Sequence, residues 1–70
     1  MRKGLQNLQT EEEKANAQYK ILAVDDEEGI IDSLSIFLKR SGYNFTGVTD
    51  PLEAIEKVKT EHFDMLILDF

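Results

Sequence analysis

The sequence predicts an α/β fold in which three parallel strands alternate with two helices, and three observations carry this prediction. Residues 21–24 and 65–68 form short, continuous apolar runs, as is typical of strands buried on both faces of a sheet. Between them lies an apolar pattern with helical spacing, followed by a second helix that begins at a proline. Strands that alternate with helices indicate parallel pairing with helical crossovers.

Length and composition exclude several classes of protein. The 70 residues carry 14 acidic and 8 basic side chains, which gives a net charge of −6, and 41% are apolar, close to the globular norm. The absence of cysteine excludes disulfides and thiolate metal sites. A single histidine, His62, cannot build a multi-histidine zinc site.

The charge and the short apolar runs also limit location and partners. No run approaches the roughly 20 apolar residues that span a bilayer, and no apolar stretch follows Arg2 and Lys3 to make a secretory signal. A cytoplasmic location is therefore expected. An acidic segment repels phosphate backbones, so direct binding of nucleic acid is not expected.

Residues 1–19 form a polar leader that differs in composition from the rest. Thr10 followed by Glu13 fits a capping box, which predicts a short helix over about 11–18. Two interpretations stay open: a solvated leader or linker, or a helix that packs on a partner or an upstream domain.

The first strand–helix unit follows the leader. A strand at 21–24 is followed by a helix that starts near Glu28, with Asp26 as a candidate N-cap and Gly42 as the C-terminal glycine cap. Acidic residues begin this helix and basic residues end it, in agreement with the macrodipole. Its predicted apolar face consists of Ile30, Ile31, Leu34, Phe37 and Leu38.

The second unit begins with a shorter strand at 44–48. Asp50, Pro51 and Glu53 mark the start of a helix that runs to about Thr60, and 64–69 is predicted as a third buried strand. The predicted buried side of this second helix is Leu52, Ala54, Ile55 and Val58, and the predicted core aromatics are Phe37, Phe45 and Phe63.

Right-handed crossovers limit how the three strands can be arranged. The order 1-2-3 is compatible with the pattern, but the more apolar first and third strands favour the order 2-1-3. In that order the two helices lie on opposite faces of the sheet. Ligands of open α/β sheets bind where the strand order reverses, which here is between the ends of the first and third strands.

Three carboxylates are expected at this reversal point. Asp25 and Asp26 leave the first strand and Asp69 ends the third, and adjacent strands lie about 4.8 Å apart. Carboxylates that converge in this way repel one another, and Mg²⁺ would relieve the repulsion because it prefers hard oxygen ligands. A carboxylate beside such an ion can attack phosphorus to give an acyl phosphate. The simpler alternative is that the acids cap a helix or lie in solvated turns.

From residue 19 onward the sequence resembles the first half of a response-regulator receiver domain, the phosphoacceptor module of two-component signalling. The residues that carry the resemblance are the runs ILAVDDE at 21–27, DPLEA at 50–54 and DMLILD at 64–69. The resemblance implies a flavodoxin-like, CheY-like fold, here reduced to β-α-β-α-β.

The resemblance also implies roles for the three acids. Asp69 would be the phosphorylated aspartate, Asp26 would ligate Mg²⁺ directly, and Asp25 would act with it, often through water. The donor would be a phosphohistidine on a sensor histidine kinase or a phosphotransfer protein, and the phosphoryl group would later be hydrolysed. The module is expected to act as a phosphoacceptor and not as an enzyme.

The family pattern continues beyond Phe70. It supplies a backbone metal ligand two residues after the phosphoacceptor, a Ser or Thr after the fourth strand and a Lys after the fifth. The 70 residues are therefore expected to be a truncated or partial receiver domain, with the third strand as an apolar edge. Self-association through this edge, or completion of the sheet by a partner chain, is expected.

Two other functions remain open at this point. The first is a protein-interaction module that works without phosphorylation. A Mg²⁺-dependent phosphohydrolase with Asp69 as nucleophile is the third class, although such chemistry usually needs a second acid shortly after the nucleophile.

Overall fold

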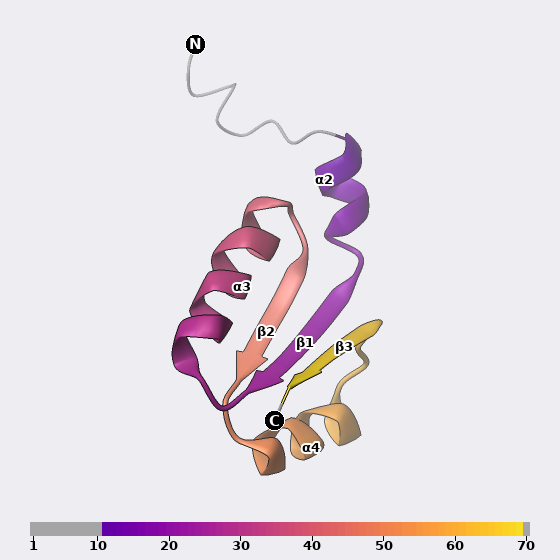
Figure 1. Ribbon diagram of the computed structural model, residues 1–70. Helices are drawn as coiled ribbons and strands as arrows, with labels where there is room; N and C mark the ends of the chain where they lie inside the picture. The colour runs from indigo at the N-terminus through magenta and orange to yellow at the C-terminus, as the bar shows by residue number, and fades with distance from the viewer. Residues whose placement is uncertain (1–10, 70) are drawn as a thin grey trace.

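A computed structural model describes residues 11–69, and within them the strands form one parallel sheet (Figure 1). The strand order is β2-β1-β3, as predicted. The elements in chain order are α2 (Glu11–Asn16), β1 (Lys20–Asp25), α3 (Glu28–Arg40), β2 (Asn44–Val48), α4 (Pro51–Thr60) and β3 (Met65–Asp69). Thr10, which carries the predicted capping box, lies outside the described residues, as does Phe70.

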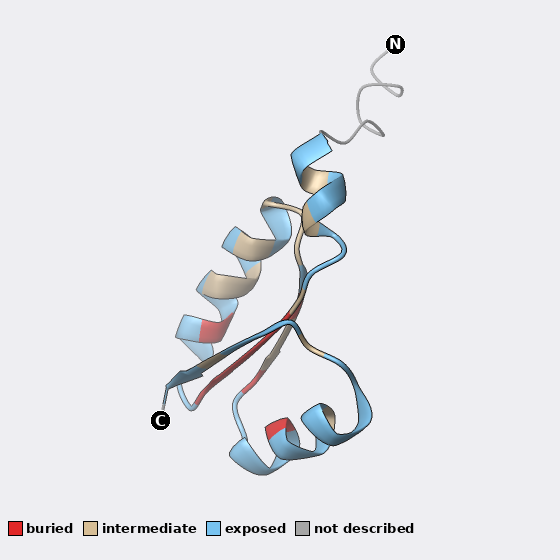
Figure 2. Ribbon diagram, turned by 90° about the vertical axis from the view of Figure 1, so that its right-hand side faces the viewer, coloured by how far each residue is buried: buried red, intermediate tan, exposed pale blue. Residues whose placement is uncertain are grey.

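The central strand β1 is the most buried part of the molecule, because it has a strand on each side and a helix over each face. Its side chains alternate between the two layers, so residues 21 and 23 face α3 while residues 22 and 24 face α4. Figure 2 shows the two helices on opposite faces of the sheet and the buried central strand between them. The core under α3 consists of Ile21, Ala23, Ile31 and Phe45, and the core under α4 consists of Leu22, Val24, Val48 and Ala54.

Two of the predicted helix caps are present. Gly42 has a φ of 93° just after α3, where the N–H groups of Gly42 and Tyr43 donate to the carbonyls of Lys39 and Leu38. Asp50 caps α4, because its Oδ1 accepts a hydrogen bond of 3.0 Å from the N–H of Leu52.

The candidate cap of α3 was wrong. Glu27, not Asp26, holds the N-cap position, and no side chain caps the helix there. The helix still begins at Glu28, as predicted, and the side chain that binds the turn is that of Asp25, whose Oδ1 accepts a hydrogen bond of 2.9 Å from the N–H of Glu27.

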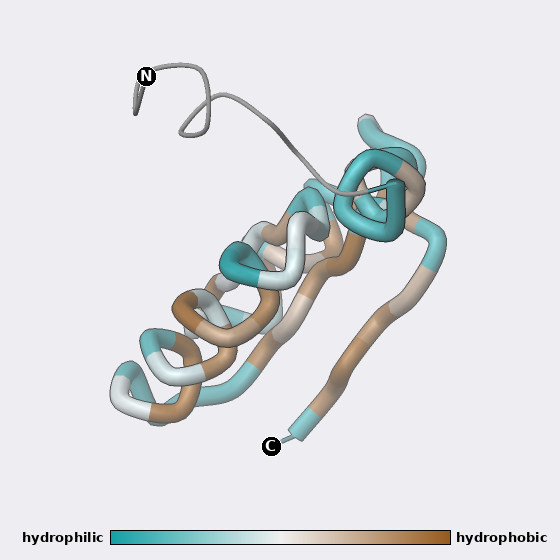
Figure 3. Tube along the Cα trace, turned by 90° about the horizontal axis from the view of Figure 1, so that it is seen from above, coloured by the Kyte–Doolittle hydropathy of each residue, from teal (hydrophilic) through white to brown (hydrophobic). Residues whose placement is uncertain are grey.

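The third strand is correctly placed but is not buried. Met65, Leu66 and Leu68 expose about half of their surfaces, and only Ile67 packs against the core under α3. The apolar run of β3 follows one margin of the sheet, with β1 as its neighbour in the described part of the chain (Figure 3). An apolar run predicts a strand, but it does not show whether both faces of that strand are covered.

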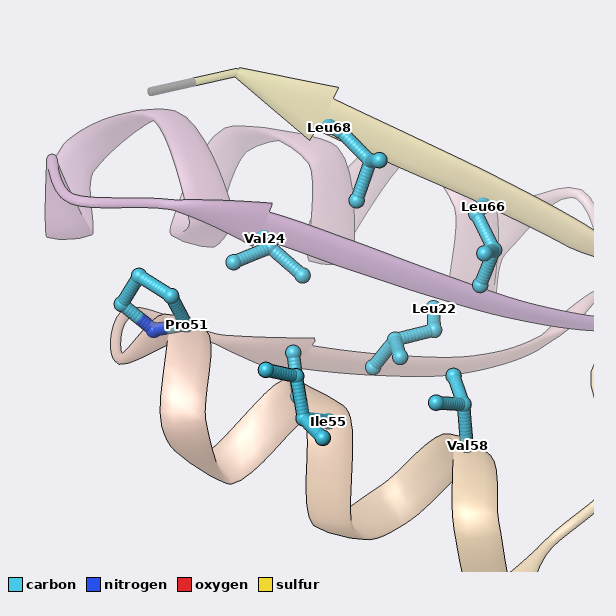
Figure 4. Close-up of a pocket in the computed structure, with 8 residues that line it drawn as sticks. Leu22, Val24, Pro51, Ile55, Val58, Leu66 and Leu68 are labelled. Atoms are coloured by element: carbon cyan, nitrogen blue, oxygen red, sulfur yellow. The ribbon is translucent and has the colours of Figure 1, made fainter.

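The buried side of α4 is narrower than predicted. Ala54 is buried, whereas Leu52, Ile55 and Val58 are 71%, 47% and 43% exposed. Ile55 and Val58 border an apolar hollow of about 360 Å³ between α4 and the sheet, which is lined on the opposite side by leucines of β1 and β3 (Figure 4). Only the edge of α4 nearest β1 and β2 therefore lies in close contact with the sheet.

The aromatic residues divide in the same way. Phe45 is buried and Phe63 is half-buried beside the core under α4, as predicted. Phe37 is 66% exposed, so its assignment to the core was wrong. It extends the apolar face of α3 past the region that the described strands cover.

The amino-terminal ends of β1 and β3 are joined by a compact polar cluster. The N–H of Lys20 donates to Asp64 Oδ2, and the N–H of Asp64 donates to the Lys20 carbonyl, both at 2.8 Å. His62 Nε2 lies 3.0 Å from Asp64 Oδ1. The exposed His62 therefore lies at the end of the sheet opposite to Asp25 and Asp69.

Candidate functional site

Asp25 and Asp69 are direct neighbours across the sheet. They are register partners at the carboxyl ends of the parallel strands β1 and β3, and such strands are about 4.8 Å apart. Their positions in the alternation match those of Ala23 and Ile67, whose side chains belong to the layer under α3. The sheet thus presents two carboxylates side by side on one face, at the point where the strand order reverses.

The two carboxylates differ in environment. Asp25 is 5% exposed, and its Oδ1 accepts a hydrogen bond of 2.9 Å from the N–H of Glu27. This bond fixes the carboxylate at the start of α3 and compensates part of the cost of burying a charge. Asp69 is exposed, so its carboxylate can be reached by a reactant from solvent.

Asp26, the third predicted residue of the site, is exposed in the turn between β1 and α3. Within residues 11–69 no three side chains of the metal-ligating types His, Cys, Asp and Glu form a group that could hold a metal ion. The structure therefore brings Asp25 and Asp69 together through backbone register, and it does not join Asp26 to them in a preformed cluster.

The donor chemistry nevertheless fits a hard cation. Asp25 and Asp69 supply only carboxylate oxygens, which suit Mg²⁺, and this ion is commonly held by one or two carboxylates with water in its other positions. Oδ1 of Asp25 already accepts the hydrogen bond from the Glu27 N–H, so Oδ2 is the oxygen left for a cation.

The bond between Asp25 and Glu27 was missed at the level of sequence. An aspartate side chain that accepts a hydrogen bond from the backbone two residues ahead is a common turn, and the Asp-Asp-Glu run was compatible with it. The signal was present, but the same run also fitted a cap at Asp26.

The sequence comparisons place this geometry in a family. Residues 21–70 match the response regulator receiver domain, and the chain belongs to this family. The match begins at the second residue of β1 and includes both strands that carry the paired aspartates.

Curated relatives agree with this assignment. The chain is 48% identical over 50 residues to the alkaline phosphatase synthesis transcriptional regulatory protein PhoP of Bacillus subtilis, covering 71% of this chain and 21% of that protein. It is 40% identical over 50 residues to the response regulator MprA of Mycobacterium leprae, covering 71% of this chain and 22% of the relative.

A third relative is the phosphoglycerate transport system transcriptional regulatory protein PgtA of Salmonella typhimurium, which is 33% identical over 54 residues, covering 77% of this chain and 13% of PgtA. The chain thus spans about a fifth or less of the length of these relatives. No solved structure gave a significant match. Among the described residues, no helix has both the length and the apolar character needed to cross a membrane.

Proposed function

We propose that Asp69 is the phosphoacceptor of this receiver segment, that Asp25 and Asp26 assist it by holding Mg²⁺, and that the donor is a phosphohistidine. The observation that carries the proposal is the register pairing of Asp25 with Asp69 at the reversal point of the sheet. Asp69 is exposed, whereas Asp25 is buried and held by a hydrogen bond. We therefore assign nucleophilic attack to Asp69 and metal positioning to Asp25.

Asp69 is suited to be the nucleophile because its carboxylate is accessible and lies at the tip of an edge strand. One of its oxygens attacks the phosphorus of the phosphohistidine, the O–P bond forms as the N–P bond breaks, and the imidazole leaves with the bonding electrons. Attack by water on phosphorus later releases phosphate and restores the carboxylate. The chain thus receives and loses a phosphoryl group, and it acts as a signalling module and not as an enzyme with a separate substrate.

Asp25 is suited to be a positioning ligand because the Glu27 N–H holds its carboxylate in place before any ligand arrives. Asp26 extends into solvent from the adjacent turn and can close on a cation from that side. Bound Mg²⁺ supplies charge neutralisation for the transferred oxygens.

The partner that this function requires is a sensor histidine kinase or a phosphotransfer protein, in the cytoplasm. The phosphoryl group adds negative charge at one end of the sheet, and a local change of this kind can bias a distant surface between two states. In the proposal the response is read by parts of the longer protein that lie outside the 70 residues.

Incubation with acetyl phosphate and Mg²⁺, followed by intact mass measurement, tests the proposal. We expect one phosphoryl adduct, which is lost in Asp69→Asn and when the metal is chelated. Asp32→Asn is the matched control, since Asp32 is an exposed carboxylate on α3 and belongs to neither of the strands that carry the paired aspartates. An adduct that survives in Asp69→Asn would place the acceptor elsewhere.

A second candidate function has its own supporting observation. The exposed apolar side chains of β3 suit a protein-interaction module that binds without phosphorylation. The absence of any adduct, even on a longer form of the protein that contains the remaining strands, would favour this alternative.

A further inference from the structure

The short helix α2 precedes the family match and is seated on the turn that follows α3. The Asn16 side-chain amide donates a partly buried hydrogen bond of 2.8 Å to the Ser41 carbonyl. After the helix, the Tyr19 carbonyl accepts a hydrogen bond of 3.1 Å from the N–H of Asn44. Residues 16 and 19 are thus tied to both sides of one turn.

Gly42 lies at the centre of the turn that α2 contacts, and we call this contact between α2 and the turn at Ser41 and Gly42 the seat of α2. A β-carbon at position 42 would lie 2.9 Å from the Glu13 carbonyl oxygen and 3.0 Å from the Glu13 α-carbon, so the backbone of α2 occupies the space of the missing side chain. Gly42 also has a φ of 93°, which other residues rarely adopt. Position 42 therefore requires glycine for two independent reasons. The backbone of α2 leaves no room for a β-carbon, and the chain needs a positive φ at the end of α3.

The helix depends on this seat for its stability. α2 has six residues, and none of them is buried. Isolated helices of this length are not stable in water, because the free-energy cost of nucleation exceeds the stabilisation from their few hydrogen bonds. Contacts with the turn at Ser41 and Gly42 must therefore supply the stabilisation that the isolated helix lacks.

The helix also borders a hollow of about 360 Å³. Glu12 and Asn16 of α2 contribute to its lining, and the remaining lining, mostly apolar, comes from α3 and its following turn, β1 and β3: Ile21, Phe37, Leu38, Ser41, Tyr43 and Met65. This hollow lies at the end of the strands opposite to Asp25 and Asp69, as the position of α2 shows (Figure 1).

We propose that residues 11–19 form a detachable strap, which folds onto the turn at Ser41 and Gly42 and covers one end of the apolar hollow. The strap opens by local unfolding while the sheet stays intact, because its contacts are few and none of the residues of α2 is buried, which places it among the least stable parts of the fold. This inference concerns the opposite end of the molecule from the phosphoacceptor and is independent of the proposed function.

Amide hydrogen exchange on the full chain tests the strap. The reporters are the N–H groups of Ala17, Gln18 and Tyr19, which donate to carbonyls within α2. Asn16→Ala removes the bond to Ser41, and we expect these three amides to exchange about fivefold faster. The amides of β1 should keep their rates, and the methyl signal of Met65 should shift as the hollow opens.

Gly42→Asn provides a second, independent variant. Asparagine tolerates a positive φ, so the end of α3 can keep its conformation while the new side chain displaces Glu13. We expect loss of protection at Ala17–Tyr19 that is at least as large as in Asn16→Ala. Lys14→Ala is the control, because the ion pair of Lys14 with Glu11 is exposed and does not involve the turn at Ser41 and Gly42, and it should leave the rates unchanged.

Two results would overturn the strap. The first is unprotected exchange at Ala17–Tyr19 in the unmodified chain, which would show that α2 is not seated. The second is equal acceleration of the strap and of β1 in both variants, which would show that the two unfold as one unit.

Discussion

At the scale of single residues, Gly47 shows how closely α3 approaches the sheet. A β-carbon at this position would lie 2.5 Å from the Ile31 Cγ2 atom and 3.1 Å from the Phe45 ring. Both neighbours belong to the core under α3, so neither can move without disturbing its packing. A glycine in a short strand predicts a close approach of some kind, but the sequence does not identify the approaching atom.

We therefore expect Gly47→Ala to destabilise the fold by about 1–3 kcal/mol, the usual cost of overpacking a core. Gly29→Ala is the matched control, because nothing lies within 4 Å of its β-carbon position on α3. There alanine should leave the stability unchanged or raise it slightly, because it displaces no neighbour and has the higher helix propensity. Urea unfolding measures the change in unfolding free energy of each variant. Equal changes would show that α3 does not pack closely against Gly47.

Asp64 provides a prediction of pH dependence. The Lys20 N–H lowers the pKa of the Asp64 carboxyl below its usual range, and the hydrogen bond with His62 lowers the pKa further. A lowered pKa means that the charged carboxylate stabilises the folded state. This contribution is complete above the unfolded-state pKa of about 3.9 and is lost as the pH falls below it, through the folded-state pKa.

Unfolding free energies measured as the pH falls below 4.5 should therefore decline less in Asp64→Asn than in the unmodified chain. Asp32→Asn, which removes an exposed carboxylate without these partners, serves as the reference. If the unfolding free energies of the unmodified chain and of Asp64→Asn fall in parallel with pH, the Asp64 carboxylate does not stabilise the junction of β1 and β3.

At the scale of elements, the start of α4 depends on a single side chain. Asp50 accepts from the N–H of Leu52, and Pro51 takes the first helical position. We expect Asp50→Ala to cost about 1 kcal/mol of stability, the typical value of an N-cap. Asp50→Ser retains a capping oxygen and should be nearly neutral. Thermal unfolding measures both, and a neutral Asp50→Ala would contradict the role of the cap.

The elements themselves could be predicted from sequence to a large extent. The strands, both main helices, the order 2-1-3, Gly42 as a cap and Asp50 as a cap followed from periodicity and local chemistry. These features depend on residues close together in the chain, or on the handedness rule for crossovers.

Burial within those elements was harder to predict. Phe37, Leu52 and Ile55 lie on apolar faces, yet the described strands and helices leave them largely exposed. Periodicity shows which side of a helix is apolar, but the extent of cover is set by the neighbouring elements. The seat of α2 was unpredictable for a related reason, because it depends on backbone atoms of Glu13 and Ser41 that are far apart in the sequence.

The candidate site was predicted in part. Placing Asp25 beside Asp69 required only the strand order and the parallel register, both of which the sequence indicated. The hydrogen bond from the Glu27 N–H to Asp25 was not predicted, because the Asp-Asp-Glu run fits both this turn and a cap at Asp26. The roles of the acids in metal binding and phosphoryl transfer stay predictions.

At the scale of the whole molecule, the exposed edge of the sheet at β3 leads us to expect self-association. Leu66 and Leu68 of β3 are 48% and 59% exposed on an edge strand. We expect the 70-residue chain to self-associate as its concentration rises, because an apolar edge offers unpaired backbone groups to another chain. Sedimentation velocity over a concentration series measures this association.

Leu66→Lys combined with Leu68→Lys should shift the chain toward monomer, since charge on an edge opposes pairing. Leu52→Lys is the control, because Leu52 is even more exposed but lies on α4, away from the β3 edge. A chain that stays monomeric across the series, or a control that acts as strongly as the double variant, would exclude association through β3.

The proposed function requires Asp25 and Asp69 to act as one site. Paramagnetic broadening by Mn²⁺, a hard cation that substitutes for Mg²⁺, tests this requirement most directly. We predict that substoichiometric Mn²⁺ selectively broadens the amide signals of residues 25–27 and 69. The signals of Asn44 and Asp64, at the opposite ends of the strands, should stay sharp. Broadening confined to one of the two strands, or spread evenly over the acidic surface, would contradict a shared site.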